Sequence, residues 1–231
     1  MPGWLIDEIG SAGRENLDPA HVARYDDKED ADAPAEVLLL QSFGIDENAT
    51  VVDLGAGTGQ FTLAAAAVWR RVIAVDVSPV MRRRLEAKTT AAGVTNIEVE
   101  AAGFLTYEHT GPPVDAIYSR AALHHLPDFW KAIALERMHR ILRPGGVVRL
   151  WDVVYSFDPS ESPAFVEAWC ATGSEDVEAE WSRAELEEHV RDEHSTFTWL
   201  LEPMIERVGF TIDDAAYSED GFSAKYVLTK A

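Results

Sequence analysis

Short apolar runs alternate with longer helical segments through the middle of the chain, and this alternation limits the folds open to it. Each run is rich in β-branched or other apolar residues. Five such runs lie at residues 49–54, 71–77, 96–101, 114–119 and 147–154. Because buried parallel strands read as near-continuous apolar runs joined by right-handed helical crossovers, the pattern predicts an α/β fold with a mostly parallel, doubly wound sheet.

The end of the chain follows a different pattern. Residues 210–217 and 222–230 read as strands, and the turn sequence SEDG separates them. The pair predicts an antiparallel hairpin at one edge of the sheet, which brings the expected total to seven strands. With 231 residues, the chain is long enough for one domain with a sizeable core and short for two, so we expect a single domain over residues 1–231.

Two segments lie outside the core pattern. We expect residues 1–45 to form an N-terminal helical lid. Residues 156–200 are acidic and contain three tryptophans, and we expect them to form a helical insertion that caps the substrate.

Several helix ends are marked in the sequence. Ser78 and Pro79 predict the start of one helix and Gly93 its end, while Asp128 predicts the cap of a later helix.

Charge and cysteine content narrow the class of partner. The 40 acidic residues exceed the 20 lysines and arginines, which gives a formal net charge of −20 at pH 7. Such a field repels nucleic-acid phosphates and anionic lipids, so we expect neither nucleic acid nor a membrane as a partner. The single cysteine, Cys170, cannot form an intramolecular disulfide and is expected to be a buried structural thiol.

The expected location is the cytoplasm. The first residues lack the pattern of a signal peptide, and no segment reaches the roughly 18 apolar residues of a membrane span. A homodimer is compatible with the sequence, which does not decide the oligomeric state.

The loop after the first run, in VVDLGAGTGQ, indicates what the sheet binds. Gly55, Gly57 and Gly59 are spaced G-x-G-x-G, whereas a dinucleotide fingerprint would place its third glycine at Gln60. No Lys-Ser or Lys-Thr follows, which excludes a phosphate-binding P-loop. Asp53 lies at the end of the strand that precedes the loop, where it would repel a pyrophosphate and favour a ligand with positive charge.

A second acid supports this interpretation. Asp76 ends the next strand, where an acid can accept hydrogen bonds from both ribose hydroxyls. The expected ligand therefore has a ribose, no essential phosphate and a cationic part near Asp53. S-adenosylmethionine, with S-adenosylhomocysteine as its product, meets these requirements. Glycines that only form a tight turn and aspartates that only cap helices are the alternative interpretation.

Over residues 35–155 the chain resembles the class I S-adenosylmethionine-dependent methyltransferases. The matching stretches, in order, are VVDLGAGTGQF, VIAVDVSPVM, AGFL, VDAIYSRAALHHL and ILRPGGVVRL. The resemblance is to the branch of small-molecule and quinone-type enzymes, and it implies a Rossmann-like sheet whose last strand is reversed. These motifs are specific for the fold and the cofactor, but not for the methyl acceptor.

The resemblance also implies roles for individual residues. The methionine part of the cofactor would lie against Asp53, Gly55, Ala56 and Gly57. Asp76 would hold the ribose.

Val77 would pack against adenine. The family often has an acid in its third motif that binds the adenine amino group, and this chain has Ala102 and Gly103 there. The backbone of Gly103 and Phe104 is the expected substitute.

Three further residues are expected near the methyl group by the same resemblance. Ser119 and Arg120 end the fourth strand, where the family contacts the cofactor. The segment HVARYDD resembles an N-terminal segment whose tyrosine, here Tyr25, closes over the cofactor.

The chemistry needs few catalytic groups because the sulfonium is already an activated leaving group, and positioning supplies most of the effect. Where the acceptor enters protonated, a general base is required, for which His124, His125 and His194 are candidates. Adjacent residues rarely project the same way, so we expect at most one of His124 and His125 to face the cavity. Each can equally be a structural histidine.

We expect no metal site, because no acid-rich ligand set is evident. His189 and Glu193 lie four residues apart on an expected helix, where they read equally well as an ordinary surface pair.

The acceptor site is the least defined in the sequence. The aromatic residues of the expected cap either line an apolar pocket or form helix-packing core; they are Phe165, Trp169, Trp181, Phe197 and Trp199.

Near the fifth run, Asp152 and Tyr155 are expected on the ligand side of the sheet. Asp115 starts its strand and therefore lies at the opposite end.

The expected function is methyl transfer from S-adenosylmethionine to a small molecule by in-line displacement. An RNA methyltransferase is one alternative, although the net charge and the missing Asn-Pro-Pro-aromatic motif are against it. A nicotinamide oxidoreductase is disfavoured by the glycine spacing. A non-catalytic protein that binds S-adenosylmethionine stays open, because a fold alone does not determine activity.

Overall fold

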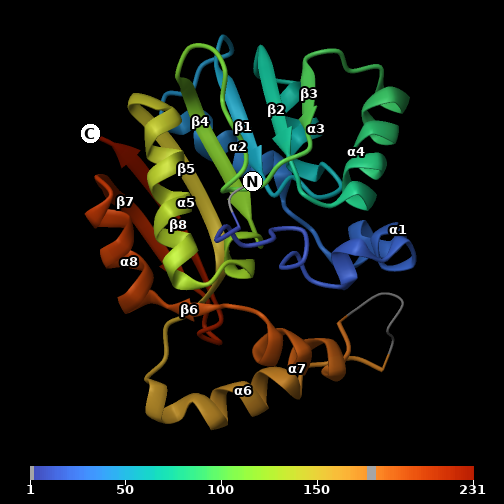
Figure 1. Ribbon diagram of the computed structural model, residues 1–231, viewed down its shortest axis with the longest axis vertical. Helices are drawn as coiled ribbons and strands as arrows, with labels where there is room; N and C mark the ends of the chain where they lie inside the picture. The colour runs from blue at the N-terminus through green and yellow to red at the C-terminus, as the bar shows by residue number, and fades with distance from the viewer. Residues whose placement is uncertain (1–2, 176–180) are drawn as a thin grey trace.

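The computed structural model describes residues 3–175 and 181–231 and contains one mixed sheet with helices on both faces (Figure 1). The strand order is β3-β2-β1-β4-β5-β8-β7, with β6 beside β5. The strands are β1 Thr50–Leu54, β2 Arg71–Val75, β3 Ile97–Glu100, β4 Val114–Arg120, β5 Leu142–Tyr155, β6 Thr196–Phe197, β7 Phe210–Tyr217 and β8 Ser223–Lys230.

Strands β1 to β5 pair in parallel, and β8 pairs antiparallel to both β5 and β7. The expected α/β fold, the five internal strands and the C-terminal hairpin are confirmed. The short β6 is the one strand of the sheet that the sequence did not predict.

Two apolar clusters hold the helices against the two faces of the sheet. Helices α5 and α8 pack in the cluster that contains Val52 and Leu54 of β1. Helices α2 and α3 pack in the cluster that contains Val51. Neighbouring residues of β1 thus point to opposite faces, as the two-residue period of a strand requires.

The helical segments have these bounds: η1 Glu15–Leu17, α1 Pro19–Lys28, α2 Ala33–Ser42, α3 Gln60–Ala66, α4 Pro79–Ala92, η2 Leu123–His125, α5 Asp128–Ile141, η3 Pro159–Glu161, α6 Ser162–Cys170, α7 Arg183–Asp192 and α8 Thr198–Arg207. None of the helices in the described part of the chain is long and apolar enough to cross a membrane.

The predicted ends of α4 are confirmed. Ser78 accepts hydrogen bonds from the backbone N–H groups of Val80 and Met81, and Gly93 ends the helix with a positive φ of 66°.

The prediction that Asp128 caps α5 is wrong. Pro127 holds the cap position, and Asp128 is the first residue of the helix. Its carboxylate instead accepts from Lys131 Nζ at 2.9 Å and from Thr196 Oγ1 at 3.2 Å. It therefore ties the start of α5 to β6.

The end of the sheet where β1 to β5 finish is covered by segments from distant parts of the chain. In Figure 1, α6 and α7 lie below the sheet, and α1 lies on the right, between them and α4. Lys28 of α1 donates to Glu185 of α7 at 3.1 Å. Trp181 Nε1 donates to Glu29 Oε1 at 2.7 Å, which adds a second tie between the N-terminal segment and the insertion.

These contacts bear on the two segments that we expect to act as lid and cap. Within residues 1–45, α2 packs against α3 in the apolar cluster, so the part next to the sheet end is residues 3–32. Within residues 156–200, α6 and α7 are helical as expected, and residues 176–180 lie outside the described residues.

A buried ion pair joins α2 to the sheet. Arg149 of β5 donates through Nε and Nη2 to the two carboxylate oxygens of Glu36, at 2.6 and 2.9 Å. Only 6% and 7% of the two side chains are exposed. Removing one partner of such a pair leaves an uncompensated buried charge.

We expect Glu36→Ala to lower the free energy of unfolding by about 3–5 kcal/mol, measured by urea denaturation, because Arg149 loses its counter-ion. The double variant Glu36→Met/Arg149→Met should recover most of this loss, because it removes both charges and keeps apolar volume. A single-variant cost below about 1 kcal/mol would contradict the assignment of this pair as a structural link.

Candidate active site

The glycine loop leaves open space beside its own backbone. Gly55, Gly57 and Gly59 all have positive φ, at 76°, 54° and 85°. A Cβ at Gly55 would lie 2.3 Å from the Cβ of Ala122, so this position admits no side chain without a shift. A Cβ at Gly57 would meet nothing within 4 Å, which places Gly57 at the edge of a cavity.

Asp76 connects this loop to the start of α4. Its Oδ2 accepts from the backbone N–H of Gly57 at 2.8 Å, and its Oδ1 accepts from the N–H of Ser78 at 2.7 Å. Burial raises the pKa of the carboxyl group, and the two backbone donors oppose that rise. Each carboxylate oxygen keeps a second acceptor site for a ligand.

A first cavity opens between this acid and the N-terminal segment. Most of the residues expected to bind the cofactor line it: Tyr25, Gly55, Gly57, Asp76, Val77, Gly103, Phe104 and Arg120. Ala56 and Asp53 line a smaller cavity, which shares Tyr25, Gly57 and Arg120 with the first.

Asp53 is more enclosed than the sequence suggests. Its side chain lies in the buried strand β1, where Oδ2 accepts from Thr62 Oγ1 at 2.5 Å. Burial raises the pKa of Asp53 to about 7, although the bond from Thr62 acts in the opposite direction. The carboxyl group of Asp53 therefore titrates near neutral pH.

Ser119 does not belong with the other expected residues. It is fully buried within β4 and lines neither the first nor the smaller cavity, so the structure does not support the expected contact with the cofactor. The chain turns sharply after Arg120, with Ala121 at a φ of 47°, and Ala121 and Ala122 line the first cavity instead.

Arg120 is held away from bulk solvent by the N-terminal segment. Its Nη2 donates to Glu29 Oε2 at 2.7 Å and to the Asp30 carbonyl at 3.1 Å. The guanidinium also lies over the ring of Trp151, 4.5 Å from its centroid.

Glu8 is a lining residue of the first cavity that the sequence did not reveal. Its carboxylate accepts from the backbone N–H of Leu105 at 3.0 Å and from Thr106 Oγ1 at 2.7 Å. The N–H of Gly103 already donates to Thr106 Oγ1 at 2.9 Å, and its carbonyl accepts from Tyr107. The buried acid thus lies beside the loop where this chain lacks the acid expected from the family's third motif.

A second cavity, of about 680 Å³, lies between the sheet end and the insertion. Four residues line both cavities: Asn16, Tyr25, Ala121 and His125. Trp169 and Trp181 line the second cavity, whereas Trp199 is exposed and outside it. Phe165 and Phe197 instead pack against Phe157.

Both histidines of the adjacent pair line the second cavity, so the expectation that at most one would face it is wrong. Their ring centroids are 4.3 Å apart. The short η2 turn, rather than a strand, carries them, which lets neighbouring side chains project to one side.

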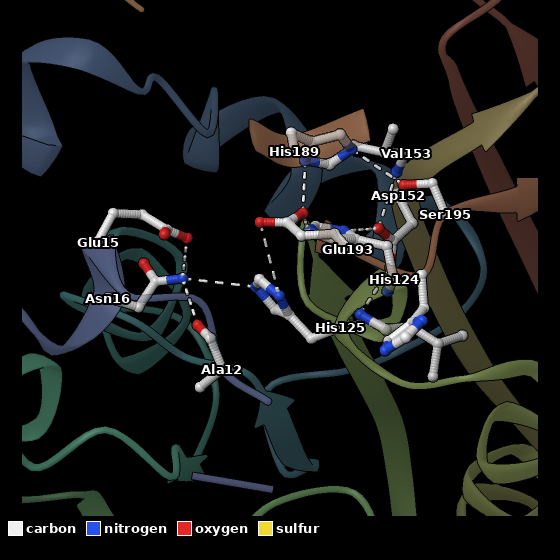
Figure 2. Close-up of polar contacts among 12 residues, drawn as sticks. Ala12, Glu15, Asn16, His124, His125, Asp152, Val153, His189, Glu193 and Ser195 are labelled. Carbon is white, nitrogen blue, oxygen red and sulfur yellow. Dashed lines mark hydrogen bonds and ion pairs between the residues drawn. The ribbon is translucent and has the colours of Figure 1, made fainter. Parts of the chain in front are cut away.

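Asp152 holds one of these rings rather than a substrate. It is buried in β5, and its Oδ1 lies 2.5 Å from His124 Nδ1 (Figure 2). Its Oδ2 accepts from the backbone N–H groups of Leu123 and His124 at 2.7 and 3.2 Å. The expected role of Asp152 in orienting a polar substrate is therefore replaced by one in orienting His124.

The two adjacent histidines, His124 and His125, differ strongly in pKa. Burial lowers the pKa of His124, but Asp152 and Glu193 outweigh it and raise the value to about 10. Burial and the neighbouring His124 lower the pKa of His125 to about 3.

The suggestion of His194 as a catalytic base is not supported by its position. Its backbone N–H donates to the His124 carbonyl at 3.0 Å, and its carbonyl accepts from Lys131 Nζ. The residue lines neither cavity.

Glu193 and His189 belong to the same cluster, rather than to the protein surface. Figure 2 shows the Glu193 carboxylate among three imidazole rings. Its oxygens lie 2.5 Å from His189 Nδ1, 3.0 Å from His124 Nε2 and 3.9 Å from His125 Nδ1. The sequence contained the adjacent histidines and the four-residue spacing, but only the fold brings them together.

The expectation of no metal site is untested, but the fold forms a cluster of potential ligands that the sequence did not indicate. His124, His125 and Glu193 each present one potential ligand atom, and these atoms lie within 4.8 Å of one another.

Comparison with known proteins agrees with this fold. Residues 51–146 match a family model described as a methyltransferase domain. An uncharacterized methyltransferase of Oceanobacillus iheyensis is 31% identical over 105 residues, which cover 46% of this chain and 47% of the relative. The trans-aconitate 2-methyltransferase of an Azoarcus species is 35% identical over 114 residues, which cover 48% of this chain and 42% of the relative. The chain thus spans about half the length of the curated relatives it matches.

The fold extends the similarity over the whole chain. The crystal structure of magnesium protoporphyrin IX methyltransferase from Synechocystis, with bound S-adenosylmethionine, aligns with a TM-score of 0.67 at 12% identity. The alignment covers 99% of this chain and 100% of that one. Residues 51–146 thus match a methyltransferase domain, and the chain has the Rossmann-like α/β fold of S-adenosylmethionine-dependent methyltransferases.

Proposed function

We propose that this chain transfers a methyl group from S-adenosylmethionine, bound in the first cavity, to a small molecule held in the second. The observation that carries the proposal is the junction of the two cavities, where Asn16, Tyr25, Ala121 and His125 line both. Bound S-adenosylmethionine would supply an activated methyl group: the acceptor nucleophile would bond to the methyl carbon as the carbon–sulfur bond breaks, with S-adenosylhomocysteine as the leaving group. The task of the protein is then to hold the two ligands in register at this junction.

The first cavity offers a matching contact for each part of the cofactor. Asp76 accepts hydrogen bonds from the ribose hydroxyls, next to the backbone donors that it already binds. The methionine part lies along Gly55, Ala56 and Gly57, and the carboxyl group of Asp53 lies beside this loop. Val77 packs against the adenine.

The N-terminal segment completes the site in this proposal. Tyr25 lines both cavities from α1 and closes over the cofactor. Glu8, rather than the backbone of Gly103 and Phe104, accepts from the adenine amino group. The acid lies beside the loop at 103–106, whose polar groups it already binds.

The second cavity favours a small acceptor over RNA. Among its described lining residues, Arg14 is the sole lysine or arginine. Five glutamates also line it: Glu15, Glu29, Glu185, Glu188 and Glu193. An acidic cavity repels a phosphate backbone. The cytoplasmic location and the absence of nucleic-acid partners stay predictions from the sequence.

The first test is of methyl transfer itself. With a panel of amine, hydroxyl and carboxylate acceptors, the unmodified protein should release S-adenosylhomocysteine in the presence of at least one of them.

The ribose contact is tested with the variant Asp76→Ala. It should weaken S-adenosylhomocysteine binding by at least about tenfold, measured by calorimetry, because hydrogen bonds to a charged group are each worth about 1.5–3 kcal/mol.

Glu100→Ala is the matched control, since Glu100 ends the neighbouring strand β3 and lines neither cavity. Unchanged affinity in Asp76→Ala would rule out the assigned ribose contact. Tight cofactor binding with no product from any acceptor would favour a non-catalytic binding protein.

A second test uses the raised pKa of Asp53. An ordinary aspartate titrates near 3.9, so between about pH 4 and pH 7 the folded chain keeps a proton that the unfolded chain has lost. Stability from this group is therefore lost as the pH rises through 7. Asp53→Asn should raise the melting temperature more at pH 8 than at pH 5, while weakening S-adenosylmethionine binding. An equal change at both pH values would contradict the buried, titrating carboxyl group.

A third test examines Glu8. We expect the protein to prefer S-adenosylhomocysteine over its inosine analogue, which lacks the adenine amino group, by about tenfold or more, because the hydrogen bond involves a charged acceptor. Glu8→Ala should abolish this preference, and Glu8→Gln, which keeps an acceptor oxygen, should retain part of it. Equal weakening of both ligands in Glu8→Ala would show that Glu8 only supports the loop.

A further inference from the structure

The cluster around Glu193 brings together three side chains with the ligand atoms of a metal site. His124 and His125 come from the η2 turn after β4, whereas Glu193 follows α7 in the insertion. Figure 2 shows both rings turned toward the carboxylate, with His124 Nε2 at 3.0 Å and His125 Nδ1 at 3.9 Å from its oxygens. We propose that His124, His125 and Glu193 bind a divalent transition-metal ion at the wall of the second cavity.

The residues behind the cluster resemble the supporting contacts of a metal site. Metal-bound histidines usually direct their other ring nitrogen to a carboxylate, which fixes the tautomer. Asp152 Oδ1 lies 2.5 Å from His124 Nδ1 and holds a proton there, so Nε2, which faces Glu193, is the ring nitrogen that would bind an ion after losing its proton. Asp152 is in turn fixed by three backbone N–H groups, those of Leu123, His124 and Val153.

A buried nitrogen without a hydrogen-bond partner also favours a metal site here. His125 Nδ1 is buried and has no hydrogen-bond partner among the described residues. Buried polar atoms are normally paired, so a nitrogen left unpaired beside a carboxylate is explained by a missing ligand. Across the carboxylate, His189 Nδ1 lies 2.5 Å from Glu193 and its Nε2 lies 3.0 Å from Ser195 Oγ, an arrangement that orients Glu193.

The donor set selects the class of ion. Two imidazole nitrogens and one carboxylate oxygen suit Zn²⁺, Fe²⁺, Co²⁺ or Ni²⁺, whereas Mg²⁺ and Ca²⁺ prefer all-oxygen sites. Around an ion at about 2.0–2.1 Å, ligand atoms lie roughly 3.3 Å apart. The three atoms here lie within 4.8 Å of one another, so binding would draw the side chains closer together by up to about 1.5 Å.

An ion at this position would have an open side toward the acceptor. Three protein ligands leave at least one coordination position, as in catalytic zinc sites. All three residues line the second cavity, and His125 also lines the first. An acceptor hydroxyl or carboxylate oxygen can fill that position. The metal site stands without methyl transfer, and only this role toward the acceptor rests on the proposed function.

The test measures metal binding by the full chain, prepared without a histidine tag and stripped with a chelator. After dialysis against Zn²⁺ or Co²⁺, we expect one ion per chain by mass spectrometry, and a visible absorption spectrum of low-symmetry Co²⁺. Mg²⁺ should not compete. His125→Gln and Glu193→Gln should each weaken Zn²⁺ binding by at least about 100-fold, and Asp152→Asn by about 10–100-fold, which is the usual effect of a supporting contact.

His194→Gln is the matched control, because it removes a nearby imidazole that lines neither cavity and should leave the affinity unchanged. Circular dichroism without metal checks that each variant is folded, and a crystal structure with Zn²⁺ locates the ion if a variant is not. Less than one tightly bound ion, or equal affinity in folded His125→Gln, would overturn the site.

Activity separates the two proposals. A bound ion without methyl transfer would refute the proposed function and leave the site. Methyl transfer at an undiminished rate after chelation would refute the role of the ion toward the acceptor.

Discussion

A single carboxylate, that of Asp76, connects the two loops that shape the first cavity. It accepts from Gly57 in the loop after β1 and from Ser78 at the start of α4. Because β1 and β2 are parallel neighbours, their ends meet at the same edge of the sheet, and one acid can reach both loops. The left-handed backbone of the glycine loop, the cap of α4 and the open space at Gly57 all lie around this carboxylate.

The second cavity depends on ion pairs between segments that are distant in sequence. Glu29 accepts from both Arg120 of β4 and Trp181 of the insertion, while Lys28 pairs with Glu185 of α7. These contacts neutralise part of the acidity of the N-terminal segment and hold it against the insertion. They also leave a wall rich in carboxylates, where a bound cation lowers the electrostatic cost of burying them.

Histidines and acids at the junction illustrate how one cluster supports two interpretations. The pKa of His124, at about 10, describes an imidazolium stabilised by Asp152 and Glu193. A divalent ion between the same side chains would supply that positive charge instead. Measuring the metal content distinguishes the two states directly, because a cluster held together by a protonated His124 would contain no Zn²⁺.

Local patterns in the sequence determined the strands of the sheet, their mostly parallel direction, the C-terminal hairpin and most of the residues that line the first cavity. Those features depend on neighbours in the chain: apolar runs of strand length, a glycine loop after a strand and an acid at the next strand end. Glu8, the pairing of His124 with Asp152, and the approach of Glu193 to both histidines depend on segments far apart in sequence. Side-chain contacts of that kind have no period or spacing, so only the tertiary structure decided them. The sequence placed Ser119 and Arg120 at the end of β4, but only the structure showed that Arg120 lines the first cavity and Ser119 does not.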